Sequence, residues 1–234
     1  MTELDYGRFE ALTFDCYGTL IDWEAGILAG IRPVLDARGV KATDDELLGE
    51  FATAEATLEA GPYLRYREIL GRCLREVAAD HAVAPDLADV AAFADSVGDW
   101  PAFPDSTDAL ARLHERFRLG VITNCDDDLF ARSAARLGTT FDAVVTAESV
   151  GAYKPDPRGF GVAFERLGLP PERVLHVAQS LFHDHVPAKR LGLTTVWIDR
   201  RHDRPGTGAT PPADATPDAT FPDMASFAAV ATRR

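Results

Sequence analysis

Asp15 is the residue best placed for chemistry in this 234-residue chain. It ends a short apolar run, residues 9–15, which is typical of a buried strand. A carboxylate is costly to bury at such a place unless it is hydrogen-bonded or used. Gly18 permits a tight turn, so that the amides of Tyr17 and Gly18 are expected to face the carboxylate, and Thr19 can bond to the same loop. The stretch suits a carboxylate nucleophile that forms an enzyme-bound ester, although an aspartate that merely caps a turn fits it too.

Three further groups of polar residues follow in the order that such a site needs. One follows the apolar run 119–123, one lies in a loop stiffened by Pro155, and one ends the run 173–178. Ligands of open α/β sheets bind at the carboxyl ends of the strands, so these groups are expected to meet near Asp15. The side chains concerned are Thr123, Asn124, Lys154, Gln179, Ser180 and Asp184.

The elements that must hold these residues alternate along the chain from residue 105 onward. Alternating strands and helices of this length predict βαβ units, and hence an α/β fold with a Rossmann-like parallel sheet. The predicted strands are 9–15, 119–123, 143–146, 173–178 and 194–198, and the predicted helices between or after them are 106–115, 129–137, 159–167, 187–191 and 221–231.

The segment 22–100 interrupts this alternation just after the first strand. It carries helical patterns at 27–38, 43–61, 63–81 and 85–97, and Thr43 with Glu46 forms a capping box. The segment is predicted to be an inserted helical cap at the carboxyl edge of the sheet. Residues 1–21 and 101–234 then form the core, and the Pro- and Ala-rich stretch 203–220 is expected to be a flexible loop within it.

Residues 9–200 resemble the haloacid dehalogenase superfamily, and most closely its type II 2-haloacid dehalogenases. The most specific piece is the stretch 14–22, FDCYGTLID. The resemblance implies a Rossmann-like core with a helical cap, a possible homodimer, and Asp15 as the nucleophile. It also implies that Thr123 and Asn124 bind the substrate carboxylate or transferred group, that Lys154 balances the charge of Asp15, and that Asp184 orients or activates water.

Two positions separate this chain from the phosphatases of the superfamily. Those enzymes carry a second aspartate, which protonates the leaving alkoxide, where this chain has Tyr17, and a magnesium-binding aspartate where it has Gln179. Loss of a general acid typically costs 10²–10⁴ in rate, whereas a halide leaves without a proton. Both differences favour displacement at carbon with no required cofactor. Under the phosphatase alternative, Mg²⁺ would be held by Asp15, the Tyr17 carbonyl and Asp184.

Other positions depart from the type II dehalogenases. Those enzymes place an arginine early in the second cap helix to receive the halide, and the stretch 51–55 here has none. Arg65, Arg67 or Arg32 could substitute, although a solvated role is the commoner one for such residues. Gln179, Leu181 and Phe160 replace polar groups of the family, which predicts a rebuilt pocket. The residues predicted to contact the substrate are Tyr17, Thr19, Thr123, Asn124, Gln179, Ser180, Arg65 and Arg67.

Composition limits the partners. The chain has 24 Lys and Arg against 37 Asp and Glu, a formal net charge of −13, which argues against nucleic acid and anionic membranes as partners. A small anionic substrate remains compatible. Three unpaired cysteines and the absence of a basic, apolar leader predict a cytoplasmic protein. His183 and His185 are assigned structural roles rather than metal ligation, and residues 126–128 (DDD) an N-cap role.

The function predicted from the sequence is hydrolysis through an ester on Asp15, of the 2-haloacid dehalogenase kind, which yields a 2-hydroxy acid. The alternatives are a magnesium-dependent phosphatase of the same superfamily, or a catalytically weak binding or regulatory homologue. Retention of Asp15, Thr19, Lys154 and Asp184 weighs against the last alternative.

Overall fold

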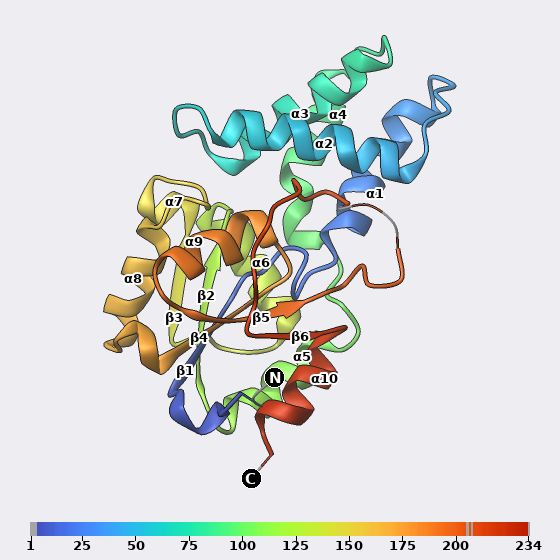
Figure 1. The fold of residues 1–234 in the computed structure, drawn as a ribbon. Helices are drawn as coiled ribbons and strands as arrows, with labels where there is room; N and C mark the ends of the chain where they lie inside the picture. Colours follow the sequence, from blue (N-terminus) through green and yellow to red (C-terminus); the bar gives the residue numbers. More distant parts are fainter. Residues whose placement is uncertain (1–3, 205, 207, 234) are drawn as a thin grey trace.

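A parallel sheet forms the centre of the molecule in the computed structural model, which describes residues 4–204, 206 and 208–233 (Figure 1). Six strands are paired in the order β3-β2-β1-β4-β5-β6, and every pairing is parallel. The predicted α/β fold is therefore confirmed. The strands are β1 (Ala11–Phe14), β2 (Arg118–Thr123), β3 (Ala143–Thr146), β4 (Val174–Ala178), β5 (Thr194–Ile198) and β6 (Ala219–Phe221).

The register of the central strands brings the polar residues that follow them to one edge. Phe14 at the end of β1 lies opposite Val121 on β2 and Val177 on β4. The amide of Asp15 continues this pairing, because it donates to the Val177 carbonyl at 3.1 Å. The segments that follow β1, β2 and β4 consequently leave the sheet side by side.

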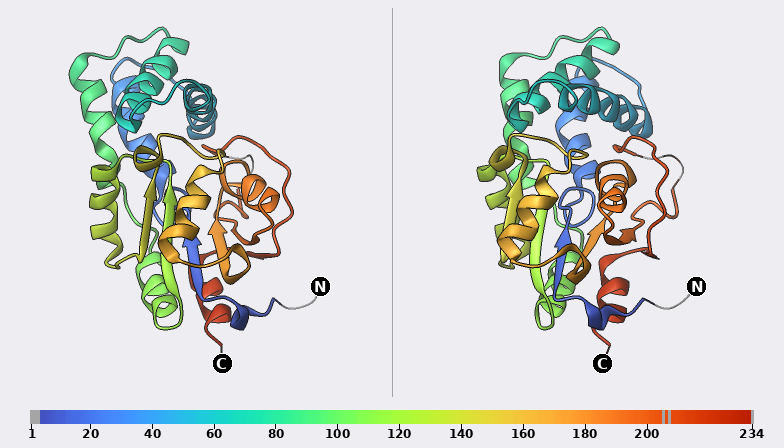
Figure 2. Two further views of the ribbon diagram at one scale, coloured as in Figure 1. Left: turned by 90° about the vertical axis from the view of Figure 1, so that its left-hand side faces the viewer. Right: turned by 60° about the vertical axis from the view of Figure 1, so that its left-hand side comes forward.

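Helices cover both faces of the sheet (Figure 2). One face is covered by α8 (Arg158–Leu167) and α9 (Val186–Arg190), and a separate apolar cluster around Phe160 joins them to the strands. The other face is covered by α5 (Ser106–His114), α6 (Asp127–Leu137) and α10 (Met224–Ala231), whose apolar side chains belong to the main core. Short elements complete the core: η1 (Tyr6–Arg8), α7 (Ala147–Val150) and η3 (Pro171–Arg173).

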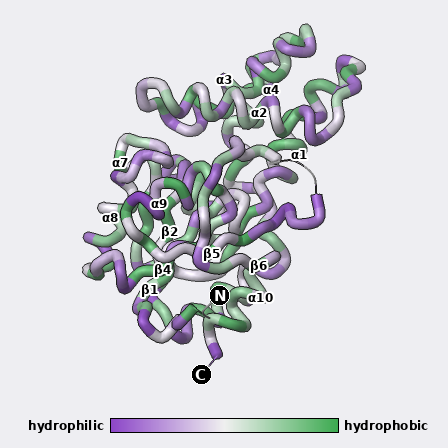
Figure 3. The backbone as a smooth tube through the Cα atoms, in the orientation of Figure 1, coloured by the Kyte–Doolittle hydropathy of each residue, from purple (hydrophilic) through white to green (hydrophobic). Residues whose placement is uncertain are grey.

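The first part of the segment between β1 and β2, from α1 to η2, is helical and lies over the carboxyl edge of the sheet (Figure 1). We call this segment the cap. It comprises α1 (Trp23–Asp36), α2 (Asp44–Glu59), α3 (Tyr66–Asp80), α4 (Leu87–Asp95) and a 3₁₀ turn, η2 (Ser96–Asp99). Hydrophilic and hydrophobic residues interchange along its helices, as expected where one face of each helix packs and the other meets solvent (Figure 3). The predicted capping box is confirmed, since Thr43 and Glu46 bond reciprocally at the start of α2.

The chain enters and leaves the cap at one place. Ile21 pairs with Tyr17 before the cap and with Ala102 after it, so the two connecting segments lie side by side. Asp22 then starts α1, because its carboxylate accepts from the Ala25 amide at 3.2 Å. The exact domain boundaries, residues 22 and 100, stay a prediction.

The region after β5 differs from expectation in one respect. The stretch 203–220 was expected to lack regular structure, but Ala219 and Thr220 belong to β6, which pairs with β5. A three-residue strand is too short to show an alternating pattern in the sequence. The closing helix begins at Met224 rather than 221, because Asp223 caps it through the Ser226 amide. The predicted flexibility of this stretch remains untested, and its residues 205 and 207 lie outside the described residues.

Within the described ranges, none of the helices combines the length and apolar character needed to cross a bilayer.

Candidate active site

Asp15 lies at the carboxyl end of β1 and is held on both carboxylate oxygens. Thr19 Oγ1 donates to Oδ2 at 2.7 Å, and Lys154 Nζ donates to Oδ1 at 2.8 Å. Gly18 has a φ of +91°, a conformation that favours glycine, and this turn brings Thr19 back beneath the carboxylate. The Gly18 amide does not face Asp15 as predicted, since it donates to the Ile21 carbonyl at 2.8 Å and so closes the turn instead.

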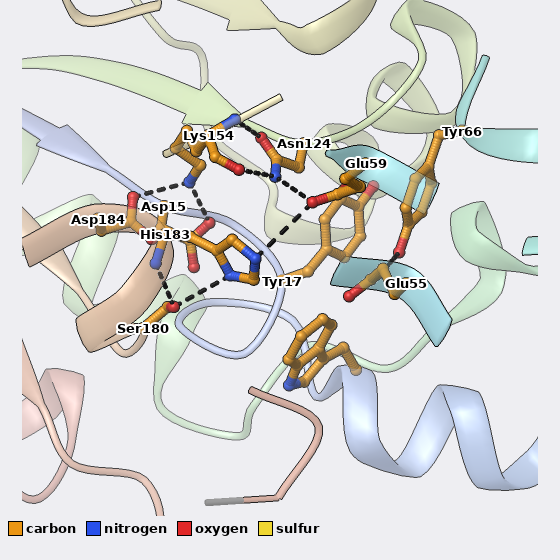
Figure 4. Close-up of a pocket in the computed structure, with 11 residues that line it drawn as sticks. Asp15, Tyr17, Glu55, Glu59, Tyr66, Asn124, Lys154, Ser180, His183 and Asp184 are labelled. Atoms are coloured by element: carbon orange, nitrogen blue, oxygen red, sulfur yellow. Dashed lines mark hydrogen bonds and ion pairs between the residues drawn. The ribbon is translucent and has the colours of Figure 1, made fainter. Parts of the chain in front are cut away.

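Lys154 joins Asp15 to the second predicted carboxylate. Its ammonium group also donates to Asp184 Oδ1 at 2.7 Å and to the Ile122 carbonyl at 2.9 Å, so all three of its protons are used (Figure 4). Asp184 lies in a π-helical turn, η4 (Leu181–His185), that follows β4. Behind it, His176 Nε2 lies 3.0 Å from Asp184 Oδ1, and His176 Nδ1 lies 3.0 Å from Thr13 Oγ1. The cation thus stands between two buried carboxylates.

The charges of these three groups depend on one another. Burial raises the pKa of Asp15, and the charge of Asp184 adds to this, while Lys154 and Thr19 act in the opposite direction. Burial also disfavours the charge of Asp184, but Lys154 and His176 outweigh it and hold the pKa of Asp184 well below its usual range. Burial opposes the charge of Lys154, yet the two carboxylates raise its pKa, so Lys154 stays protonated.

A small pocket lies over Asp15, between the sheet edge and the cap (Figure 4). In this conformation its cavity volume is about 20 Å³, which is room for about one water molecule. Six of the predicted site residues line it, namely Asp15, Tyr17, Asn124, Lys154, Ser180 and Asp184. Five other residues complete the lining, namely Trp23, Glu55, Glu59, Tyr66 and His183.

The Tyr17 side chain borders this pocket, but its hydroxyl is directed elsewhere. The phenol oxygen lies 3.0 Å from Ser133 Oγ on α6 and accepts from Cys125 Sγ at 3.4 Å. Burial raises the pKa of Tyr17 well above its ordinary value. The phenol is therefore committed to the core and is a poor proton donor.

Asn124 and Thr123 differ from the roles that the resemblance implies. Asn124 Oδ1 accepts from the Lys154 amide at 2.7 Å, and Asn124 Nδ2 donates to the Lys154 carbonyl and to Glu59 Oε2, both at 3.1 Å. These bonds occupy the whole amide group. Thr123 is buried beside β3 and does not line the pocket. The arrangement makes Asn124 a residue that positions Lys154 rather than a free carboxylate receptor.

The side chains of Thr19 and Gln179 also bond to other groups of the protein and do not line the pocket. Thr19 Oγ1 accepts from the Gln179 amide at 2.9 Å, so both capacities of its hydroxyl are used. The Gln179 side chain points away, since its Oε1 accepts from Thr210 Oγ1 at 3.3 Å. Gln179 is half-buried and does not line the pocket over Asp15, so a different residue at this position does not change the lining of that pocket.

Arg65 and Arg67, which were predicted to contact the substrate, lie outside the pocket in this conformation. Arg65 Nη2 lies 3.0 Å from Glu148, and Arg67 Nη2 lies 2.6 Å from Asp128. Both guanidinium groups pair the cap with acidic residues of the core, and neither lines the pocket. Arg32 is paired with Asp44 on the cap surface. The sequence could not reveal the pairs of Arg65 and Arg67, because their acidic partners in the core lie more than sixty positions away.

Two acidic residues of the cap were missed by the sequence reading. Glu55 and Glu59 lie one turn apart on α2 and face Asp15 across the pocket (Figure 4). Tyr66 donates to Glu55 Oε1 at 2.7 Å. Burial raises the pKa of Glu55 to about 7, and it raises the pKa of Glu59 well above its ordinary value, with the charge of Glu55 as a further cause. The spacing of four residues between Glu55 and Glu59 predicts that they share one face of the helix, but it does not show whether that face is turned toward the pocket.

Asp126 caps a different helix from the one expected. It precedes α6, but its carboxylate accepts from the amides of Tyr66 at 2.8 Å and Arg67 at 3.2 Å, at the start of α3. A core carboxylate therefore caps a helix of the cap domain. His185 is turned away from the pocket, since its Nε2 lies 3.0 Å from the Ala178 carbonyl.

The residues around Asp15 fit a magnesium ion poorly. The carboxylates of Asp15 and Asp184 both contact Lys154 through Oδ1, and Gln179 supplies no charge and faces Thr210. In the part of the chain that the structure describes, no group of three or more His, Cys, Asp or Glu side chains is arranged to hold a metal. A neutral amide that faces away does not replace the magnesium-binding aspartate that the phosphatases have at this position.

Comparisons with known proteins match this architecture. A family model described as haloacid dehalogenase-like hydrolase matches residues 9–182. An (S)-2-haloacid dehalogenase of Pseudomonas putida is 24% identical over 226 residues, which cover 94% of this chain and 95% of that protein. A validoxylamine A 7'-phosphate phosphatase of Streptomyces hygroscopicus subsp. limoneus is 31% identical over 150 residues, 58% of this chain and 70% of that protein.

Solved structures agree on the fold. The structure of an L-2-haloacid dehalogenase from Xanthobacter autotrophicus aligns with a TM-score of 0.78 at 19% identity, covering 95% of this chain and 98% of that one. The similarity thus extends over both the sheet and the cap.

Proposed function

The chain belongs to the haloacid dehalogenase-like hydrolases, and from this premise we propose that it displaces a leaving group from carbon 2 of a small carboxylic acid. Asp15 attacks the carbon, the carbon–oxygen bond forms, and the leaving group departs with its bonding electrons. Water then attacks the carbonyl carbon of the Asp15 ester. This step restores Asp15 and releases a 2-hydroxy acid whose carbon is inverted.

The contact of Lys154 with both carboxylates is the observation that carries this proposal. Its ammonium holds Asp15 in place at 2.8 Å and keeps Asp184 ionised at 2.7 Å. A nucleophile needs its negative charge oriented, and a base that takes a proton from water must be ionised before that step. The two carboxylates can therefore take different roles, Asp15 in ester formation and Asp184 in ester hydrolysis.

Tyr17 favours a leaving group that needs no strong acid beside the nucleophile. Its phenol bonds to Ser133, and its raised pKa makes it a weak donor. A phosphate monoester would also bring further negative charge to a pocket in which Lys154 already serves two carboxylates. A halide on a small acid suits this charge balance better.

Halide release tests the proposal. The wild type is incubated with chloro-, bromo- and fluoro-substituted 2-acids, with and without Mg²⁺, and the Asp15→Asn variant serves as the control. We expect release without added metal and none from the variant. A single turnover in water labelled with heavy oxygen should place label in Asp15.

Two results would contradict it. Hydrolysis of p-nitrophenyl phosphate that EDTA abolishes, without halide release, would favour the phosphatase. Unchanged ligand affinity in Asp15→Asn with no turnover in the wild type would favour a binding protein.

A further inference from the structure

Glu59 and His183 face each other across the pocket from different domains. Glu59 comes from α2 of the cap and His183 from the π-helical turn after β4, with 3.7 Å between Glu59 Oε2 and His183 Nε2 (Figure 4). Both side chains are more than nine-tenths buried. Among the described residues, Glu59 Oε1 and His183 Nε2 have no hydrogen-bond partner. Buried polar atoms of this kind are costly, so a bound group that pairs with them would be favoured.

The surroundings of Glu59 keep a proton on it. Its Oε2 accepts from Asn124 Nδ2 at 3.1 Å, and Glu55 lies one turn away on the same helix face. Lys154, the nearest cation of the pocket, donates its three hydrogen bonds to other oxygens. Burial and the charge of Glu55 raise the pKa of Glu59 well above its ordinary value. Since Oε2 acts as the acceptor, the proton lies on Oε1.

His183 offers a second proton from the opposite side. Its backbone amide donates to Ser180 Oγ at 2.9 Å, so the Ser180 hydroxyl proton is free to point at His183 Nδ1, 3.1 Å away. That bond leaves the ring proton on Nε2. Burial lowers the pKa of His183 to about 4, so the ring is neutral at neutral pH. The pocket therefore presents an O–H from the cap and an N–H from the turn after β4.

Resting on the proposed function, we propose that Glu59 and His183 form the receptor for the leaving group, in the role that an arginine has in the related dehalogenases, and that Glu59 is its hydrogen-bond donor from the cap. Asp15 attacks from the sheet, so the leaving group departs on the opposite side of the carbon, toward the cap. The carbon–halogen bond breaks with its electrons on the halide, which accepts hydrogen bonds from Glu59 and His183.

The receptor distinguishes leaving groups by their basicity. Fluoride is the most basic halide and the strongest hydrogen-bond acceptor among them, so it gains most from the Glu59 O–H and the His183 N–H. It leaves as the anion, and Glu59 keeps its proton because hydrogen fluoride is the stronger acid. Bromide is a weaker acceptor and gains less. The substrate class that this receptor favours is therefore a small acid with a fluoride leaving group.

Rates with paired substrates test this receptor. Glu59→Gln keeps the shape but offers an N–H, the weaker donor, in place of the O–H. We expect its fluoride release to fall about tenfold, while bromide release changes by about threefold or less. Glu50→Gln is the matched control, because Glu50 lies on α2 but pairs with His81 outside the pocket. Equal loss for both halides in Glu59→Gln would overturn the proposal, since misfolding of the cap affects both.

Two measurements need no turnover. The infrared difference between wild type and Glu59→Gln at neutral pH should contain the carbonyl band of a protonated carboxylic acid, and the difference between wild type and Glu50→Gln should lack this band.

In the Asp15→Asn variant, whose neutral side chain imitates the ester, chloride NMR lines should broaden, and adding Glu59→Leu should remove the broadening. If the wild type releases no halide at all, the proposed function fails while these two results still decide the receptor. Absence of the band or of the broadening would refute it.

Discussion

Asn124 and Lys154 bind each other in both directions. The Lys154 amide donates to Asn124 Oδ1 at 2.7 Å, and Asn124 Nδ2 donates to the Lys154 carbonyl at 3.1 Å. One side chain after β2 therefore fixes the backbone of the loop that carries the lysine. From that backbone, the Lys154 ammonium reaches Asp15 and Asp184. The position of the Lys154 ammonium beside Asp15 thus depends on the Asn124 side chain, which need not touch the substrate.

Replacing Asn124 with leucine should impair catalysis through Lys154. Without the clamp the ammonium is held less well, so we expect kcat to fall about 10²-fold, with a smaller change in KM. Because Lys154 lowers the pKa of Asp15, its looser placement should also move the acid limb of the pH–rate profile to higher pH. A purely structural role would lower the amount of folded enzyme without moving that limb.

Replacing Lys154 with methionine should have a larger effect of the same kind. The variant leaves two buried carboxylates adjacent without their cation, which typically costs about 3–5 kcal/mol of unfolding free energy. The pKa of Asp15 should rise further, so Asp15 stays protonated, and the variant inactive, over more of the pH range. Urea unfolding and the rate profile measure the two consequences. A variant as stable as wild type at neutral pH would contradict this reading of the ion pair.

Glu55 should make stability fall as pH rises. Its pKa is raised from 4.5 to about 7 in the folded protein by burial, so its stabilising contribution is complete below 4.5 and is lost as pH rises through about 7. Glu55→Gln cannot lose a proton, and we expect its melting temperature to decline less over this window. Glu50→Gln, whose half-buried side chain on α2 pairs with His81 outside the pocket, should follow the wild type. Parallel curves for all three proteins would show that Glu55 is ionised throughout.

Asp126→Ala should loosen the cap at the start of α3. Two backbone amides lose their acceptor, and loss of a helix cap typically costs about 0.5–2 kcal/mol. Hydrogen exchange at Tyr66 and Arg67 should accelerate more than at other cap amides. Asp128→Ala removes an exposed partner of Arg67 and should have little effect on those two amides. Comparable acceleration in both variants would argue for a general electrostatic effect.

Neutral replacements of Arg65 and Arg67 should leave substrate affinity unchanged. Both side chains pair with core carboxylates rather than face the pocket. We expect the KM of Arg65→Gln and Arg67→Gln to stay within about twofold of wild type, because exposed ion pairs contribute about 1 kcal/mol or less. A rise in KM with unchanged kcat for either variant would restore the substrate contact predicted from the sequence.

The contrast between Asp15 and Glu59 shows what the sequence can predict. Asp15, Thr19 and Lys154 were found because strand ends and glycine turns are local patterns, and parallel strands collect their ends at one edge. Glu59 was missed because its direction depends on how α2 docks against the sheet. That docking rests on contacts between distant residues, such as the Asp126 carboxylate at the start of α3.

The same reason explains why the partner of Arg67 and the strand β6 were not predicted from the sequence. A guanidinium group is equally suited to a substrate and to a carboxylate, and only the folded chain shows that Asp128 is its neighbour. β6 has three residues, and its pairing with β5 is decided by the sheet rather than by its own composition. Gln179 was predicted to depart from the family pattern, but the direction of its side chain toward Thr210 could not be read from the sequence.

The pairing of Ile21 with Ala102 makes the cap a detachable module. The backbone departs from and returns to neighbouring positions, so the rest of the chain could be rejoined there by a short link with a small entropic cost. Different caps could be grafted at this junction without disturbing the strand order. Since the cap supplies Glu55 and Glu59 while the rest of the chain supplies Asp15 and Lys154, an exchange of caps would alter the pocket lining and keep the contact of Asp15 with Lys154.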